Sequence, residues 1–312
     1  MPEFYEKGAQ KFARLPIRID HSFRSIPKPK WLRVKALSMS ENSRHLADIL
    51  SEARLSTVCR EASCPNIGEC FSRGTAAFLV MGNVCTRRCP FCDVAHGRPD
   101  PLDATEPQRL AQAVRRMNLK YVVVTSVDRD DLSDGGALHY SRIIHALRTS
   151  VCGVRIEILI PDFRGRLENA LNILRQTPPD VFNHNLETVP SLYKIARPGA
   201  DYQHSLRVLR EFKQLCPDVY TKSGLMLGIG ETDEEVFKVL EDLLVNKVEI
   251  LTLGQYLAPS HAHLPVRRYV SPDEFKRWQT CALKMGFKKV FAGVFVRSSY
   301  HAQDLMDCTQ TL

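Results

Sequence analysis

Short runs of β-branched and apolar residues recur along this chain at intervals of roughly 30–40 residues, the length of one strand–helix unit. The runs are FLVMGNV (78–84), YVVVTSV (121–127), VRIEILI (154–160), VFNHNLE (181–187), YTKSGLML (220–227), EILTLGQYL (249–257) and VFAGVF (290–295). Strands joined by crossover helices pair in parallel, because each helix returns the chain to the same end of the sheet. The sequence therefore predicts an α/β fold with a parallel sheet.

Helix signals lie between these runs. Thr232–Glu235 forms a capping box ahead of an apolar stripe, and Ser271–Glu274 is a start signal with a stop at Gly286. A further stripe extends from Leu206 to Cys216. The strands and helices therefore alternate.

Some of the predicted strands carry polar residues on one face. Arg155 and Glu157 share a face, as do Asn183, Asn185 and Glu187. Parallel strands that are covered on both sides are usually apolar throughout. A polar face favours a cavity inside a curved sheet, and hence a complete or partial barrel over an open doubly wound sheet. The alternative is that these residues lie at exposed strand ends.

The bulk properties limit the kind of protein. The 312 residues suffice for a well-buried core, and no apolar run reaches the length of a membrane span. The start, MPEFYEKGAQ, has charges where a signal peptide needs an apolar run, so we expect a cytosolic protein. Its ten cysteines are then better explained by metal binding or catalysis than by disulfides. The net charge of +8 suits nucleic acid, an anionic surface or an acidic partner equally.

Three cysteines follow the first predicted strand in NVCTRRCPFCDV, with the spacing Cys85-x3-Cys89-x2-Cys92. A βα barrel places its chemistry at this end of its strands. Thiolates suit soft metals, and an iron–sulfur cluster usually has four of them. Three thiolates would leave one iron open to a small molecule. The alternative is a zinc site that His96 completes.

A second trio, Cys59-x4-Cys64-x5-Cys70, lies upstream in TVCREASCPNIGEC and again lacks a local fourth cysteine. The absence of helical periodicity there predicts a loop. Four cysteines remain. Cys216 and Cys281 lie on apolar helical stripes and are interpreted as core residues. Cys152 in a turn and Cys308 near the tail could each complete a site.

The downstream trio resembles the CxxxCxφC motif of the radical S-adenosylmethionine superfamily, with Phe91 as the aromatic φ. That resemblance implies that Cys85, Cys89 and Cys92 hold a [4Fe–4S] cluster whose open iron binds S-adenosylmethionine. Reductive cleavage of this cofactor yields methionine and a 5′-deoxyadenosyl radical.

The same resemblance implies contacts to the rest of the cofactor. The turn Asp134-Gly135-Gly136 corresponds to the glycine turn that receives the methionine amino group, although it lacks the usual closing glutamate. Glu157 and Asn183 are candidates for the ribose hydroxyls. An ordinary loop at a helix start is the alternative for the turn.

Over residues 55–302 the chain resembles lipoyl synthases closely, in stretches that include TVCREASCPNIGEC, TSVDRDDLSDGG, FNHNLETV and VRSSYHA. This implies that Cys59, Cys64 and Cys70 hold an auxiliary [4Fe–4S] cluster, with Ser299 of the RSSY motif as fourth ligand. It also implies a partial TIM-type (β/α)6 barrel at 76–285, an N-terminal extension at 1–75 with the auxiliary loop, and a closing segment at 286–312.

The family resemblance implies a sulfurtransferase reaction. Such enzymes insert sulfur at carbons 6 and 8 of an octanoyl group attached to a lipoyl carrier domain, and the auxiliary cluster supplies the sulfur. The carriers are E2 subunits of 2-oxoacid dehydrogenases and the glycine cleavage H protein. A ferredoxin or flavodoxin would donate electrons and an iron–sulfur carrier would repair the cluster, with no nucleic acid or membrane partner. The basic balance of the chain fits an acidic carrier, and the candidates for the docking face are five arginines: Arg73, Arg87, Arg88, Arg164 and Arg197.

Three other classes can be compared with this interpretation. A radical enzyme with different chemistry would keep the downstream trio but lack the upstream trio and RSSY. An electron-transfer protein would carry closed four-cysteine clusters. A zinc-containing nucleic-acid module would need paired Cys/His sites beside a basic or aromatic surface.

Overall fold

A computed structural model describes residues 5–15, 19, 26–32, 41–62, 64, 66 and 77–299. Cys70, Arg73, Tyr300 and Cys308 lie outside these residues. Within the described ranges, eight strands form one sheet in the order β11-β10-β9-β8-β7-β6-β3-β2. The strands of this sheet are β2 (Ser56–Thr57), β3 (Ala77–Val80), β6 (Tyr121–Ser126), β7 (Arg155–Leu159), β8 (Val181–Asn183), β9 (Tyr220–Leu227), β10 (Ile250–Gln255) and β11 (Lys289–Gly293).

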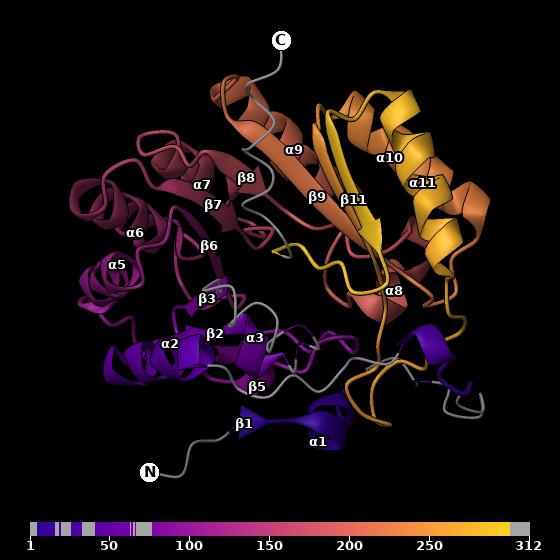
Figure 1. Cartoon of the computed structure of the whole chain (residues 1–312), viewed down its shortest axis with the longest axis horizontal. Helices are drawn as coiled ribbons and strands as arrows, with labels where there is room; N and C mark the ends of the chain where they lie inside the picture. Colours follow the sequence, from indigo (N-terminus) through magenta and orange to yellow (C-terminus); the bar gives the residue numbers. More distant parts are fainter. Residues whose placement is uncertain are drawn as a thin grey trace.

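The predicted parallel sheet is confirmed. From β3 to β11 neighbouring strands are parallel and follow the order of the chain, whereas β2 is antiparallel to β3. Figure 1 shows the helices that follow these strands along an arc outside the sheet. They are α5 (Glu106–Arg116), α6 (Ala137–Ser150), α7 (Leu167–Leu174), α8 (Tyr193–Ala196), α9 (Tyr202–Leu215), α10 (Asp233–Val245) and α11 (Pro272–Met285), with a 3-10 turn at Pro190–Leu192 before α8.

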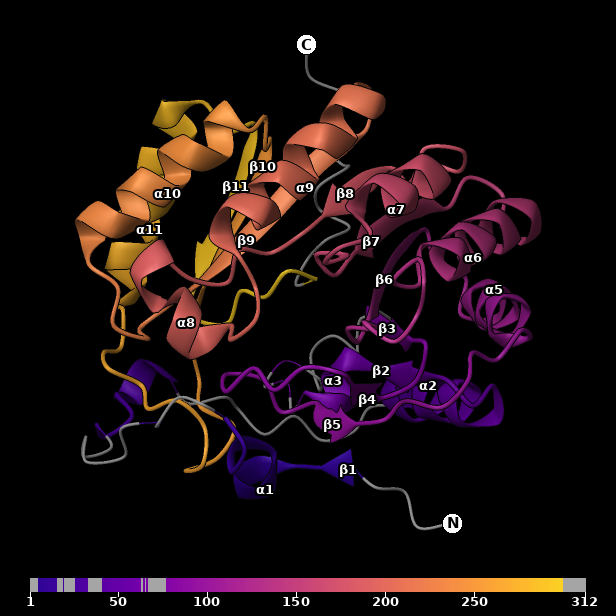
Figure 2. The same cartoon turned by 180° about the vertical axis from the view of Figure 1, so that it is seen from behind.

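The N-terminal segment lies at one end of the large sheet (Figure 2). β1 (Tyr5–Glu6) pairs antiparallel with β5 (Ala95–Gly97), which pairs in parallel with β4 (Val84–Cys85). The remaining elements before β3 are α1 (Gly8–Phe12), a 3-10 turn (Lys30–Leu32), α2 (Glu41–Glu52) and α3 (Val58–Glu61). The N-terminal segment thereby contacts β5, the strand that follows the downstream cysteine loop.

The two faces of the large sheet differ in character. Phe78, Val124 and Ile158 point outward into the main hydrophobic core that the helices cover. On the opposite face, Glu157 and Asn183 are fully buried and joined by a 2.8 Å hydrogen bond. Buried polar groups of this kind need hydrogen-bond partners, and here the partners lie on the same face of the sheet. The polar residues at alternate positions of the predicted strands therefore correctly indicated an internal polar surface. Arg155 differs, because it lies at the exposed start of β7.

The predicted helix ends are confirmed for two helices. The Thr232–Glu235 and Ser271–Glu274 capping boxes begin α10 and α11, and Gly286 ends α11 with φ 120°. None of the helices in the described part of the chain has the length and apolar character of a membrane span.

Several local expectations were wrong. FLVMGNV is not one strand, because Met81 and Gly82 adopt left-handed φ values of 66° and 87° between β3 and β4. Cys59 lies on the short helix α3 rather than in a loop. In the N-terminal extension, α2 contributes Leu46 to the main core. Cys216 follows the end of α9 and is partly exposed, as is Cys281 on α11.

Candidate active site

The downstream trio forms a compact loop. Cys85 ends β4, the Arg87 amide donates to its Sγ at 3.4 Å, and the Cys92 amide donates to the Cys89 carbonyl oxygen at 3.1 Å. All three thiols are partly exposed. Cys85 and Cys92 also pack against one apolar cluster that contains Leu79. The backbone therefore presents three soft donors from one short segment.

The thiols of this trio favour the neutral form. Burial raises the pKa of Cys89 to about 12 and also raises the pKa values of Cys85 and Cys92. The Asp128 carboxylate adds to each shift, and it accepts a hydrogen bond of 3.6 Å from Cys85 Sγ. Thiolates at such a site need a compensating positive charge, and an iron–sulfur core supplies one on binding. The donor set therefore fits a cluster.

The zinc alternative depends on His96. His96 Nδ1 lies 3.2 Å from the Arg87 carbonyl oxygen. In the described ranges, no three His, Cys, Asp or Glu side chains converge in a way that suits a single metal ion.

Arg87 inside the motif fixes the loop over the ends of two strands. Its guanidinium donates to Asp130, after β6, at 2.8 and 2.9 Å, and to Asp162, after β7, at 2.8 and 2.6 Å. Asp128 lies 3.4 Å away. Burial alone would raise the pKa of Asp162, but the hydrogen bonds and charge of Arg87 outweigh it and lower that pKa. The charged pair therefore holds the cysteine loop in position.

This network corrects the predicted docking residues. Arg87 is 7% exposed and Arg197 is 8% exposed, so neither can form a protein-docking surface. Arg88 is partly buried and pairs with Glu6 at 3.1 Å. Arg164 is the exposed candidate among the described residues.

The predicted glycine turn begins α6. Gly135 and Gly136 have φ values of 62° and 91°, and the Asp134 carboxylate accepts from the Gly136 and Leu138 amides at 3.0 and 2.8 Å. A Cβ on Gly135 would lie 2.8 Å from a ring carbon of Phe163. Helix capping and close packing thus require these glycines whether or not they also contact a cofactor.

The inner face of the sheet carries a buried polar cluster. Glu157 accepts hydrogen bonds from Tyr121 at 2.7 Å, Asn183 at 2.8 Å and Lys222 at 2.9 Å. Lys222 also donates to the Ser298 carbonyl oxygen at 2.6 Å. Asn183 Oδ1 is buried without a hydrogen-bond partner among the described residues. An unsatisfied buried acceptor of this kind suits a ligand that donates hydrogen bonds, such as a sugar hydroxyl.

Cys64 lies beside the C-terminal segment. Asn66 Nδ2 donates to the Phe295 carbonyl oxygen at 2.6 Å, across 229 residues of sequence. Burial lowers the pKa of Arg297, and the nearby Cys64 and Glu187 oppose this shift. Cys59 is buried nearby in sequence on α3, where burial raises the pKa of its thiol to about 11. The loop that carries Cys64 therefore meets the segment that carries Ser299.

Cys59 also lies near the downstream trio. Val58, which begins α3, and Ala62, which follows it, pack against the same apolar cluster as Cys85 and Cys92. α3 carries Cys59, so the fold brings Cys59 close to the downstream trio.

The C-terminal segment returns to the interior of the arc after β11 (Figure 1). Ser298 Oγ donates to Asn185 Oδ1 at 2.8 Å, and a Cβ added to Gly224 would come within 3.3 Å of that Oγ. A Cβ on Gly254 would overlap the Val296 carbonyl oxygen. The inner face of β9 and β10 is therefore shaped to receive residues 296–298.

This fit yields a prediction for Gly254→Ala. The added methyl should displace the C-terminal segment, lower the free energy of unfolding by about 1–3 kcal/mol and reduce the iron content of the purified protein. Iron analysis and chemical denaturation measure both effects. Gly293→Ala is the matched control, because its Cβ would meet only a Val296 methyl at 3.3 Å. Wild-type iron content and stability in Gly254→Ala would contradict the prediction.

Phe91 packs away from the polar cluster. It lies against an apolar group made of Ala196, Ile229, Tyr256 and Leu264. The Leu264 amide donates to the Pro90 carbonyl oxygen at 3.1 Å, which ties the cysteine loop to the connection after β10.

The sequence did not single out Lys222, and it did not indicate the contacts of Glu187 and Arg197. Lys222 points to the same face of its strand as Gly224 in the run YTKSGLML, and this alternation was the available signal. Glu187 has a left-handed φ of 67° and accepts from Asn185 at 3.0 Å. Arg197 donates to the Asn185 carbonyl oxygen at 3.1 Å, and no local pattern indicates that contact.

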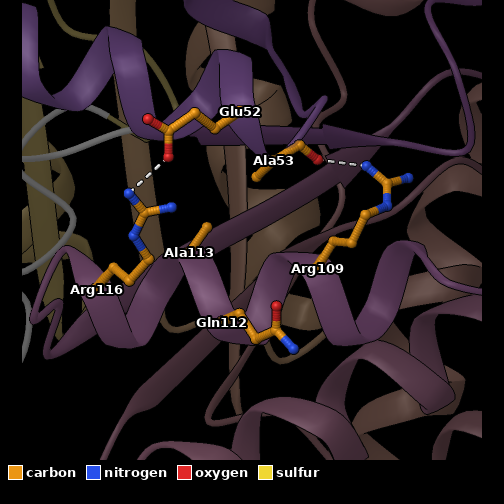
Figure 3. A pocket seen from close by; sticks show the side chains of 6 residues that line it. All are labelled: Glu52, Ala53, Arg109, Gln112, Ala113 and Arg116. Atoms are coloured by element: carbon orange, nitrogen blue, oxygen red, sulfur yellow. Dashed lines mark hydrogen bonds and ion pairs between the residues drawn. The ribbon is translucent and has the colours of Figure 1, made fainter.

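A surface pocket of about 380 Å³ lies elsewhere, between α2 and α5 (Figure 3). Arg116 contacts Glu52 at 2.7 Å across it, and Arg109 donates to the Ala53 carbonyl oxygen. Its lining residues already satisfy one another, and no cysteine is among them.

Comparison with known proteins agrees with this site. The sequence profile described as the Radical SAM superfamily matches residues 79–243, more than half of the chain. The lipoyl synthase of Laribacter hongkongensis is 60% identical over 296 residues, which cover 95% of this chain and 94% of that protein. The lipoyl synthase of Cupriavidus necator is 58% identical over 301 residues, 96% of this chain and 91% of that protein.

The fold is also similar to solved structures. SuiB of Streptococcus suis bound to S-adenosylmethionine has a TM-score of 0.54 at 11% identity, over 73% of this chain and 53% of that one. Methylornithine synthase has a TM-score of 0.51 at 14% identity, over 87% and 89%. The chain belongs to the Radical SAM superfamily and, within it, to the lipoyl synthase family.

Proposed function

We propose that this chain converts octanoyl groups on lipoyl carrier domains into lipoyl groups, by radical insertion of sulfur at carbons 6 and 8. The observation that carries the proposal is the contact between the Cys64–Asn66 loop and the segment leading to Ser299, next to the downstream trio. Sulfur insertion at an unactivated carbon needs a hydrogen-abstracting centre and a sulfur source within reach of the same carbon chain.

The ligand sets follow from this arrangement. Cys85, Cys89 and Cys92 would hold the cluster that binds S-adenosylmethionine. When bound, this pair supplies a 5′-deoxyadenosyl radical that removes hydrogen from a methylene group. A second set, Cys59, Cys64, Cys70 and Ser299, would hold the auxiliary [4Fe–4S] cluster that is consumed as the sulfur-donating substrate.

The protein's own residues position the reactants. Arg87 and its carboxylates hold the cysteine loop, while Lys222 and Asn185 hold the backbone and hydroxyl of Ser298 beside Ser299. A methylene group offers no acidic proton, so placement and exclusion of water carry the selectivity. The proposed contacts to S-adenosylmethionine are Phe91, Gly135, Gly136, Glu157 and Asn183. The free acceptor of Asn183 supports its assignment to the ribose.

We propose that different parts of the chain carry the radical site and the auxiliary cluster. A partial (β/α)6 barrel at 76–285 would provide the radical site. The extension at 1–75 and the closing segment at 286–312 would together carry the auxiliary cluster. The ordered parallel strands and the return of the chain after β11 support this division.

The proposed partners complete the reaction. The octanoylated carriers are E2 subunits of 2-oxoacid dehydrogenases and the glycine cleavage H protein. A ferredoxin or flavodoxin would reduce the radical-generating site, and an iron–sulfur carrier would rebuild the auxiliary cluster. The thiols of eight described cysteines are free, which suits the reducing cytosol.

Anaerobic incubation with an octanoylated carrier, S-adenosylmethionine and dithionite tests the proposal. The carrier should gain the mass of two sulfur atoms with loss of hydrogen, and the purified protein should contain about eight iron atoms per chain. Zinc with no visible absorption, or an unchanged carrier mass despite cleavage of S-adenosylmethionine, would reject it.

A further inference from the structure

The N-terminal helix α1 places a lysine behind the downstream cysteine loop. Lys11 is 1% exposed, and its Nζ donates to the carbonyl oxygens of Cys92 at 2.9 Å and Val94 at 2.7 Å. Nζ also lies 5.6 Å from the centre of the Phe12 ring. A buried cation from residue 11 is thus one hydrogen bond away from the backbone of a proposed cluster ligand.

Several contacts fix this segment in place. β1 pairs with β5, and Glu6 on β1 contacts Arg88 of the cysteine motif at 3.1 Å. Phe12 packs edge-on against His263, with ring centres 5.0 Å apart. The position of Lys11 therefore results from a built interface on both sides of the residue.

The charge of Lys11 has no carboxylate counterpart in the described part of the chain. Its contacts there are two backbone carbonyl oxygens and an aromatic ring. Carboxylates on neighbouring segments have other contacts, since Glu6 pairs with Arg88, and Asp93 lies 3.7 Å from His263. A buried charge without an opposite charge is costly, so such a site favours an anionic neighbour.

An iron–sulfur cluster with three thiolates is such a neighbour. The thiolates outweigh the positive charge of the oxidised core, so the assembly is anionic and becomes more anionic when it accepts an electron. A fixed cation nearby stabilises the reduced form more than the oxidised form, and so raises the reduction potential.

We propose that Lys11 is a positioning residue of the N-terminal segment that raises the reduction potential of the cluster held by Cys85, Cys89 and Cys92. The inference rests on the proposed function, because it requires a cluster at that trio. It assigns the N-terminal segment a part in electron acceptance, separate from the auxiliary site. The cluster would therefore accept an electron more readily when the N-terminal segment is packed against the cysteine loop.

Redox titration of the reconstituted holoenzyme tests this role. Electron paramagnetic resonance follows the reduced signal that changes on addition of S-adenosylmethionine, and iron content is measured on each sample. In Lys11→Met the ratio of reduced to oxidised cluster at a fixed potential should fall at least about tenfold, a shift of about 59 mV for one electron. Lys11→Gln, which keeps hydrogen-bond donors but removes the charge, should behave in the same way.

Two controls separate charge from packing. Lys11→Arg keeps the charge and should retain most of the wild-type potential. Lys7→Met removes a more exposed lysine of the same segment, which lies 4.0 Å from Glu61, and should have no effect. If Lys11→Met does not assemble the cluster, Lys11→Gln decides the comparison.

A wild-type potential in Lys11→Gln with full iron content would overturn the inference and leave the proposed function intact. Absence of an iron–sulfur signal in the wild-type protein would instead overturn the proposed function. The two failures are therefore distinguishable.

Discussion

Replacing Ser299 with alanine is expected to lower formation of the lipoyl product by at least about 100-fold, beyond the effect of typical outer-sphere changes at a metal site. Cleavage of S-adenosylmethionine should continue close to the wild-type rate, because the downstream trio is unaltered. The physical reason is that alanine removes the oxygen donor proposed for the auxiliary cluster. Carrier mass, release of 5′-deoxyadenosine and iron content measure the three effects.

Ser298→Ala is the matched control for this prediction. The Ser298 hydroxyl already donates to Asn185 at 2.8 Å, so its loss should cost about 1 kcal/mol and leave product formation largely intact. Cys59→Ala should match Ser299→Ala, with no sulfur insertion and continued cofactor cleavage. Full lipoyl formation over many turnovers by Ser299→Ala would refute the ligand assignment.

The thiol variant Ser299→Cys gives a sharper test of the oxygen ligand. An alkoxide is a harder ligand than a thiolate and a poorer match for cluster iron, so the serine-bound corner should release iron more readily. With cysteine at this position the auxiliary cluster should assemble with full iron content, yet sulfur insertion should be slower. Insertion at the wild-type rate would show that the oxygen is not required for release.

Arg87→Met is expected to lower the free energy of unfolding by about 3–5 kcal/mol. The change leaves Asp162, which is 1% exposed, and Asp130 without their shared cation. It also releases the cysteine loop from the ends of β6 and β7, so the downstream cluster should be lost with it. Denaturant unfolding and iron analysis of the purified variant measure the two consequences.

Two comparisons isolate the cause. Arg88→Met removes a neighbouring arginine that is partly exposed and pairs with Glu6, and should cost no more than about 1 kcal/mol. Adding Asp162→Asn to Arg87→Met removes the uncompensated charge and should restore part of the lost stability. Stability of Arg87→Met within 1 kcal/mol of wild type would contradict a structural role for the network.

Many residues of the candidate site could be predicted from the sequence, but the structure gives some of them other roles than the predicted ones. The spacing of Cys85, Cys89 and Cys92 located a loop that the structure shows to be compact, and the alternation that places Glu157 and Asn183 on one face indicated an internal polar surface. Arg87 and Arg197 were predicted as docking residues because the expected carrier domain is acidic, but charged side chains that face solvent were needed for that role and both are buried. Their burial depends on carboxylates and carbonyls from distant loops, and no local pattern indicates such contacts.

The sequence alone determined the strands, the capping boxes and the two cysteine spacings. Each depends on residues within a few positions of one another, through periodicity, helix capping and backbone reach. The tertiary structure alone decided which of these local features meet. The contacts of Arg87 with Asp162, Lys11 with Cys92 and Asn66 with Phe295 span 75, 81 and 229 residues. Such contacts form only when strand order and register bring distant loops to the same end of the sheet.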